Sequence, residues 1–172
     1  DGYSVKSPQG QASHYYSQPF YRVTGTLTLP EGDVEVTGNG WLDREWSSQP
    51  LAADQEGWDW FSLQFADGAR LMGFGLRGLE TVFTSATWID PDGTVTPYGD
   101  GELRMEALDW AEVAGREVPV SWRVELPERG VDIVTTPLNP GAWMDLSFAY
   151  WEGPISFSGS HEGRGYLEMT GY

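Results

Sequence analysis

Two carboxylates, an arginine and two tryptophans fall within seven residues of the chain, Gly40-Trp-Leu-Asp-Arg-Glu-Trp46. If this segment is a β-strand, alternation places Trp41, Asp43 and Glu45 on one face. A carboxyl group among indole rings is partly desolvated, which favours its protonated form and suits it to donate a proton near neutral pH. The same residues also fit a structural ion-pair network at the mouth of a barrel. The segment therefore predicts either an acid–base site or an ion-pair network.

The ion-pair interpretation involves Arg44, Glu45, Glu152 and Glu168. Arg44 beside Asp43 would hold that carboxyl in its charged form and spoil it as an acid. Alternation instead sends Arg44 to the opposite face, where Glu152 or Glu168 is its expected partner. A salt bridge of Arg44 and Glu45 that closes a barrel is the alternative.

Composition excludes several classes of function. The 172 residues suit one domain, and 26 acidic against 10 basic residues give a net charge of −16. This charge argues against nucleic acid or an anionic membrane as the partner. The chain has no cysteine, so thiol chemistry and disulfides are excluded. No apolar run approaches the ~20 residues of a membrane span.

No cofactor or metal is predicted. With two histidines and no cysteine, a zinc site would need mostly carboxylates, which match zinc poorly. The chain contains neither a Gly-x-Ser-x-Gly elbow nor a glycine-rich phosphate loop. The first residues show no signal peptide, and because an exported protein is trimmed, the compartment stays open between cytoplasmic and exported.

Short alternating runs separated by Gly, Pro and Asp turns predict an all-β chain with little helix. The clearest hairpin runs from Trp58 to Arg77 around the turn Ala66-Asp-Gly68. About ten strands at regular spacing imply a closed antiparallel barrel or a sandwich. The expected strands are Phe20–Leu29, Asp33–Gly38, Trp58–Phe65, Ala69–Arg77, Thr81–Asp90, Gly101–Leu108, Val118–Leu126, Val131–Pro137, Tyr150–Ser158 and Gly165–Thr170.

The strand Trp58–Phe65 has two chemically different faces. One carries Trp58, Trp60, Ser62 and Gln64, which combine indole surface with hydrogen-bonding groups, as a ligand pocket does. The opposite face is mainly apolar and suits a packed core. The alternative is that the two tryptophans simply fill the interior of the barrel.

Five motifs together resemble the AttH and carotenoid 1,2-hydratase family of lipocalin-like proteins, over about residues 12 to 172. The resemblance implies an antiparallel lipocalin-like β-barrel of about 8–10 strands. Residues 1–172 would form one such domain, similar to the C-terminal half of two-barrel family members, with residues 1–12 as a linker or extended arm. The motifs are His14-Tyr-Tyr-Ser17, Gly40-Trp-Leu-Asp-Arg-Glu-Trp46, Gly57-Trp-Asp-Trp60, Tyr150-Trp-Glu-Gly153 and Gly165-Tyr-Leu-Glu-Met-Thr-Gly-Tyr172.

The resemblance also implies a chemistry. In the hydratases an aspartate beside aromatic residues protonates a terminal alkene, and water captures the tertiary cation. Asp43 is similar to that aspartate, His14 to a site histidine and Tyr16 to a nearby aromatic residue. Trp41 replaces a tyrosine of the hydratases, which places the chain closer to the AttH branch. The substrate-binding set is then Tyr16, Trp41, Trp58, Trp60, Gln64 and Tyr150, with Asp43 and His14 catalytic.

Three functions fit this sequence. The first is a cofactor-independent acid–base enzyme, hydratase-like or isomerase-like, that acts on a hydrophobic isoprenoid or polyene. The second is a cofactor-free cyclase of natural-product biosynthesis, with a pericyclic, Diels–Alderase-like step that needs a shaped apolar cavity and one hydrogen-bond donor. The third is a carrier of hydrophobic ligands without catalysis. The expected partners are a hydrophobic small molecule and either a second lipocalin-like barrel or a second copy of the chain.

Overall fold

The computed structural model describes residues 2–48 and 51–172, which fall into two compact units, Asp1–Pro50 and Leu51–Tyr172. The sequence led us to expect a single barrel domain over residues 1–172, and that expectation stays a prediction.

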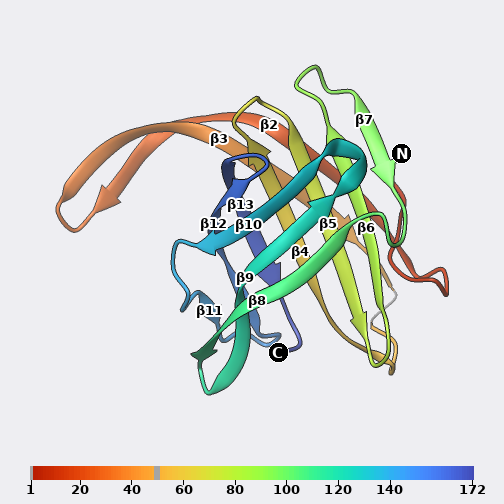
Figure 1. The fold of residues 1–172 in the computed structure, drawn as a ribbon. Coiled ribbons are helices and arrows are strands. Elements are labelled where there is room, and N and C mark those ends of the chain that lie inside the picture. Colours follow the sequence, from red (N-terminus) through yellow and green to blue (C-terminus); the bar gives the residue numbers. More distant parts are fainter. Residues whose placement is uncertain (1, 49–50) are drawn as a thin grey trace. The chain divides into compact units, whose positions relative to one another are not determined.

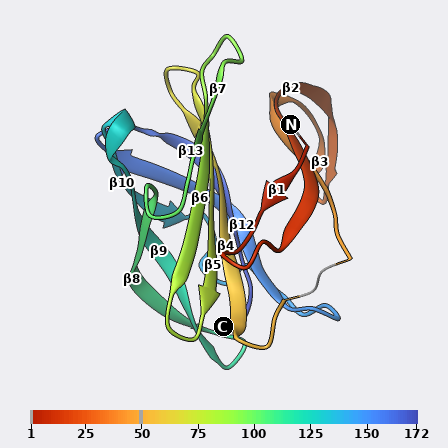
Figure 2. The ribbon, with the colours of Figure 1, turned by 90° about the vertical axis from the view of Figure 1, so that its right-hand side faces the viewer.

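The first unit is a long hairpin with a short third strand (Figure 1 and Figure 2). Strand β2 (Ala12–Leu29) turns through Pro30 and Glu31 into β3 (Gly32–Trp46), and β1 (Ser4–Val5) pairs with the start of β2. The described part of the expected arm at residues 1–12 thus includes a paired strand. Asp1, also part of that arm, lies outside the described residues.

A β-bulge divides the hairpin into two halves. Gln18 pairs with Leu42 and Tyr21 with Gly40, so β2 has one residue more than β3 between these pairs. The extra residue falls at Pro19-Phe20, where a proline costs least because a bulge needs no ladder N–H there. Beyond the bulge one face is apolar, with Tyr21, Val23, Leu27, Leu29, Val34 and Val36, whereas the other carries threonines and charged residues.

The second unit is one antiparallel sheet of ten strands, followed by colour in Figure 1 and Figure 2. Its hydrogen-bonded order is β7-β6-β5-β4-β13-β12-β10-β9-β8, and β11 pairs with β12. One 3₁₀ turn, Pro127–Arg129, is the only helical element assigned in the described residues. The strands are β4 (Gln55–Phe65), β5 (Arg70–Gly78), β6 (Val82–Ile89), β7 (Val95–Tyr98), β8 (Arg104–Val113), β9 (Arg116–Leu126), β10 (Val131–Pro137), β11 (Trp143–Met144), β12 (Tyr150–Gly159) and β13 (Gly163–Met169).

This sheet curls around its own core. Three strands separate β4 from β9 in the hydrogen-bonded order, yet the rings of Phe61 and Trp122 meet edge to face at 5.9 Å. Gly73 on β5 lies close to Leu103, so that a Cβ atom there would stand 3.1 Å from a leucine methyl. The inner face is packed with fully buried side chains, among them Phe61, Leu63, Leu71, Ile133 and Leu167. The result is a half-barrel, and the prediction of an antiparallel, lipocalin-like all-β fold is confirmed.

Sequence patterns located the main strands of both units. The predicted hairpin of Trp58 to Arg77 is present as β4 and β5. The pattern missed β1, β7 and β11, which are short, and began β2 eight residues late, at Phe20 instead of Ala12. Pro97 inside β7 and Pro19 inside β2 explain two of these errors, because proline interrupts the alternating pattern that identifies a strand.

The core predicts a contrast between two leucines of the second unit. Leu63 is fully buried, whereas Leu79 is 70% exposed. We expect Leu63→Ala to lower the free energy of unfolding by about 2–5 kcal/mol because it leaves a cavity. Leu79→Ala should change it by less than about 0.5 kcal/mol. Urea unfolding monitored by tryptophan fluorescence measures both, and equal costs would contradict this assignment of the core.

Candidate functional site

Asp43 is held by two aromatic hydrogen-bond donors within the first unit. The Tyr15 hydroxyl donates to Asp43 Oδ2 at 2.7 Å, and Trp41 Nε1 donates to Asp43 Oδ1 at 2.7 Å. Ser17, directly opposite Asp43 in the β2–β3 ladder, donates its hydroxyl to the Tyr15 oxygen at 3.2 Å. Each carboxylate oxygen thus accepts one hydrogen bond from a neutral donor whose ring is also apolar surface.

An ion pair lies beside this group on the same face of the hairpin. Lys6 Nζ is 3.2 Å from Glu45 Oε1 and 4.4 Å from the centroid of the Tyr15 ring. Glu45 stands directly opposite Tyr15, so Lys6 contacts two residues of one cross-strand pair. The charge of Lys6 is therefore matched to Glu45, while neutral donors hold Asp43. We refer to Asp43, Tyr15, Trp41 and Ser17 as the Asp43 cluster.

Two predicted site residues, His14 and Tyr16, lie on the opposite face of the hairpin from Asp43. The His14 ring stacks on Trp46 at 5.4 Å, and Tyr16 meets Trp46 edge to face at 6.5 Å. Tyr3 packs edge to face on His14 at 6.2 Å. In the described residues no hydrogen bond joins His14 to Asp43. The predicted roles of His14 and Tyr16 stay predictions, and this geometry gives neither a direct proton path to Asp43.

Tyr15 and Ser17 are the members of the Asp43 cluster that the sequence analysis missed. Tyr15 is the one that contacts Asp43 directly. It sits between the two residues chosen from the family motif, His14 and Tyr16, and strand alternation puts it on the face opposite theirs. The available signal was that cross-strand pairing of Ser17 with Asp43 places Tyr15 on the Asp43 side. Using that signal requires knowing which residues of β2 and β3 pair with each other. The bulge between Gln18 and Tyr21 shifts this pairing, so it could not be read from the sequence.

The predicted residues of the second unit lie on the outer face of its sheet. Trp58 stacks on Phe148 at 5.6 Å, meets Tyr150 edge to face at 6.1 Å, and donates Nε1–H to Glu168 at 2.8 Å. Trp60 pairs directly with Glu168 across the ladder. The interpretation in which Trp58 and Trp60 fill the barrel is wrong, because alternation on β4 gives the inner face to Phe61, Leu63 and Phe65.

The charged residues predicted as ion pairs have other partners in several cases. Glu45 pairs with Lys6, and Glu152 accepts a hydrogen bond from the Tyr166 hydroxyl at 3.2 Å. Burial together with the nearby charges of Glu152 and Glu168 raises the pKa of Tyr166 to about 12. Arg44 belongs to the first unit and these two glutamates to the second, and pairing between them stays a prediction. Gln64 stands opposite Arg164 and Arg70 in the ladder.

A buried charged group, Asp59, lies on the inner face of the second unit. Asp59 is 1% exposed, accepts a hydrogen bond from Arg77 Nε at 3.1 Å and another from the Tyr172 hydroxyl at 2.9 Å. The Arg77 guanidinium also covers the Tyr172 ring, 3.9 Å from its centroid. Burial raises the pKa of Asp59 to about 6, although Arg77 opposes that shift. Burial and the Asp59 charge likewise raise the pKa of the Tyr172 phenol.

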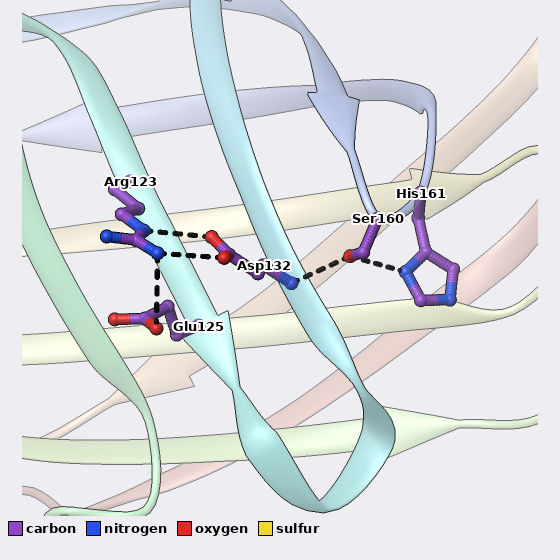
Figure 3. A network of polar contacts seen from close by, with 5 residues as sticks. All are labelled: Arg123, Glu125, Asp132, Ser160 and His161. Carbon is purple, nitrogen blue, oxygen red and sulfur yellow. Dashed lines mark hydrogen bonds and ion pairs between the residues drawn. The ribbon is translucent and has the colours of Figure 1, made fainter.

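A polar network on β9, β10 and the β12–β13 turn is drawn in Figure 3. Arg123 donates two hydrogen bonds to Asp132, each 2.8 Å, and also pairs with Glu125 at 3.7 Å. The Arg123 hydrogen bonds lower the pKa of the Asp132 carboxyl. Ser160 accepts from the Asp132 backbone N–H and lies 2.9 Å from His161 Nδ1. His161 thus sits in the turn between β12 and β13, and the Asp132 carboxylate faces Arg123 and not the histidine.

Within residues 2–48 and 51–172, no three His, Asp or Glu side chains gather in a way that could hold a metal ion. The same residues contain no helix long and apolar enough to cross a membrane.

The fold and this arrangement of residues describe a lipocalin-like all-β protein. A family profile described as AttH-like matches residues 1–172, and the chain belongs to the AttH-like family. Among solved structures it is similar to a provisionally named AttH protein from Nitrosomonas europaea, with 35% identity and a TM-score of 0.90. That match covers 99% of this chain and 56% of the other, so the chain spans little more than half of that protein's length. The search of curated proteins found no match.

The buried Asp59 predicts a pH-dependent stability. Because its folded pKa, about 6, lies above the ordinary 3.8, the folded state retains a proton that the unfolded state has lost between these values. The stability that Asp59 contributes is complete below pH 4 and is lost as the pH rises through 6. At about 1.4 kcal/mol per pKa unit, the loss is on the order of 3 kcal/mol.

Urea unfolding of the wild type and Asp59→Asn at pH 4 and pH 7 measures this contribution. The difference in free energy of unfolding, wild type minus variant, should fall as the pH rises. Asp109→Asn, an exposed residue of β8, is the matched control and should show no such trend. A difference for Asp59→Asn that is the same at both pH values would refute the assignment.

Proposed function

We propose that this AttH-family chain is a cofactor-independent acid–base enzyme that acts on a carbon–carbon double bond of a hydrophobic isoprenoid or polyene, with Asp43 as the proton donor. The observation that supports this most is the Asp43 cluster: a carboxyl group whose two oxygens each accept a hydrogen bond from an aromatic side chain. A general acid becomes a carboxylate when it gives up its proton, and these bonds stabilise that state.

The proposed reaction is hydration of an alkene. Protonated Asp43 transfers its proton to the less substituted alkene carbon, the π bond breaks, and a tertiary carbocation forms on the neighbouring carbon. A water oxygen bonds to that carbon, and the extra proton of the bound water leaves to solvent or back to the site. Asp43 regains one proton, so one alkene and one water give one alcohol.

The neighbouring rings suit a cationic intermediate. Aromatic faces attract positive charge, and Trp41 and Tyr15 place two rings within hydrogen-bond reach of the carboxylate. Their N–H and O–H groups bond to the two oxygens of Asp43, so both rings lie next to the proposed acid. The proposal also includes a second lipocalin-like barrel or a second copy of the chain as the partner, supported by the longer chain of the Nitrosomonas europaea protein.

We expect Asp43→Asn to lose turnover by at least about 100-fold, since general acid catalysis contributes about 10²–10⁴-fold and asparagine carries no acidic proton. The assay incubates each protein with a panel of acyclic polyenes and terpenoids and reads product mass. Asp33→Asn, on the distal part of the same hairpin, is the matched control and should keep wild-type turnover.

Product mass separates the alternatives. Hydration adds the mass of one water to the substrate, whereas cyclisation leaves the mass unchanged. A product of unchanged mass would identify the chain as a cyclase and contradict the proposed hydration. Equal retention of a bound lipid by wild type and Asp43→Asn, with no product from either, would leave a carrier. Full activity of Asp43→Asn would remove Asp43 as the acid.

A further inference from the structure

Building on the proposed function, we propose that Tyr15 relays the proton that recharges Asp43 after each turnover, and that Lys6 is the positioning residue that holds Tyr15 in the relay. Neither residue was a candidate from the sequence. Both belong to the first unit, and every contact in the argument lies within it.

The hydrogen bonds of the Asp43 cluster run in one direction. The Ser17 hydroxyl donates to the Tyr15 oxygen at 3.2 Å, and the Tyr15 hydroxyl donates to Asp43 Oδ2 at 2.7 Å. A proton taken up at Ser17 can therefore displace the Ser17 proton to Tyr15 and the Tyr15 proton to Asp43. No side chain has to rotate before this shift, because each donor already points at the next acceptor.

The transfer balances as a Grotthuss-type exchange. One proton, released by the water that attacks the carbocation or supplied by solvent, arrives at Ser17 Oγ. The Ser17 O–H bond breaks as a new O–H bond forms on Tyr15, and the original Tyr15 O–H bond breaks as Asp43 Oδ2 gains its proton. Ser17 and Tyr15 end neutral, and the carboxylate becomes the acid again.

Lys6 is placed to assist this transfer through Tyr15. Its ammonium lies 4.4 Å from the ring centroid, and its attraction to the π face fixes the ring. The positive charge also stabilises negative charge that develops on the phenol oxygen while its proton leaves. Two further contacts fix Lys6 itself: Glu45 at 3.2 Å, and the backbone hydrogen bond from Lys6 N to Gln11 O at 2.7 Å beside β1.

The relay predicts different effects on the first turnover and on later turnovers. In Tyr15→Phe the first turnover of enzyme protonated beforehand should lose only the effect of the one hydrogen bond from Tyr15, because Asp43 still carries its proton. Later turnovers should slow at least tenfold more than the first, because Asp43 must then regain its proton without Tyr15. Ser17→Ala should show the same split. Tyr21→Phe, on the distal hairpin, is the control and should match wild type in both phases.

Two substitutions test the role of Lys6: one removes its positive charge, and the other keeps the charge. Lys6→Met removes the charge and should slow the later turnovers as Tyr15→Phe does, whereas Lys6→Arg retains a cation over the ring and should restore most of the rate. Rapid-quench kinetics with the substrate found in the Asp43 experiment measures both phases. A uniform loss in both phases for Tyr15→Phe would mean that Tyr15 only shapes the site, and equal rates for Lys6→Met and wild type would overturn the role of Lys6.

A readout without substrate keeps this proposal separate from the proposed function. NMR of tyrosine-labelled protein follows exchange of the Tyr15 hydroxyl proton with water, which should be slow in wild type and in Lys6→Arg and fast in Lys6→Met. If no polyene is turned over, the proposed function fails and the relay fails with it, while this exchange still decides whether Lys6 holds Tyr15 against Asp43. Unchanged exchange in Lys6→Met refutes the positioning role whatever the activity.

Discussion

The register of β2 against β3 determines what surrounds Asp43. Ser17 stands opposite Asp43 and Tyr15 opposite Glu45, so the hydroxyl groups of β2 and the carboxylates of β3 share one face. Side chains alternate with a period of two. If β2 slipped by one residue against β3, His14 and Tyr16 would therefore replace Tyr15 and Ser17 on the face that carries Asp43. The bulge at Pro19-Phe20 adds one residue to β2. Odd-numbered residues of β2 therefore pair with odd-numbered residues of β3 near Asp43, as Ser17 does with Asp43, and with even-numbered residues beyond the bulge, as Val23 does with Gly38.

The second unit follows the same period-two rule with a different outcome. On β4 the odd positions Phe61, Leu63 and Phe65 build the core, and Asp59 is the next odd position before them. A charged residue in that series has to be buried, and Arg77 and Tyr172 supply its hydrogen bonds. The even positions carry Trp58 and Trp60 on the outer face, where Glu168 and Tyr150 are within reach. Sheet alternation thus separates the stabilising core from the polar aromatic surface.

Fold class was predictable from the sequence because turn residues and alternation recur through the second unit, and the hairpin of β4 and β5 was located to within a few residues. The Asp43–Trp41 part of the site was also predictable, since both residues lie on one strand two positions apart. Tyr15 and Lys6 were not, because their placement depends on pairing between strands: Tyr15 on a register that passes a bulge, and Lys6 on a short β1 strand of two residues. Local patterns carry no information on either pairing.

The kind of donor that binds Asp43 matters for acid chemistry. A lysine or arginine on the carboxylate would favour its charged form and oppose the proton uptake that each cycle needs. Here Lys6, a cation beside the cluster, is paired with Glu45 and faces the ring of Tyr15, while the donors to Asp43 within the described residues are the neutral groups of Tyr15 and Trp41. In the proposed relay the positive charge of Lys6 acts on the hydroxyl oxygen of Tyr15, which gives up a proton to Asp43 and regains one from Ser17. With one tyrosine between the cation and the carboxylate, Asp43 is ordered by hydrogen bonds from aromatic side chains and not by a direct ion pair with Lys6.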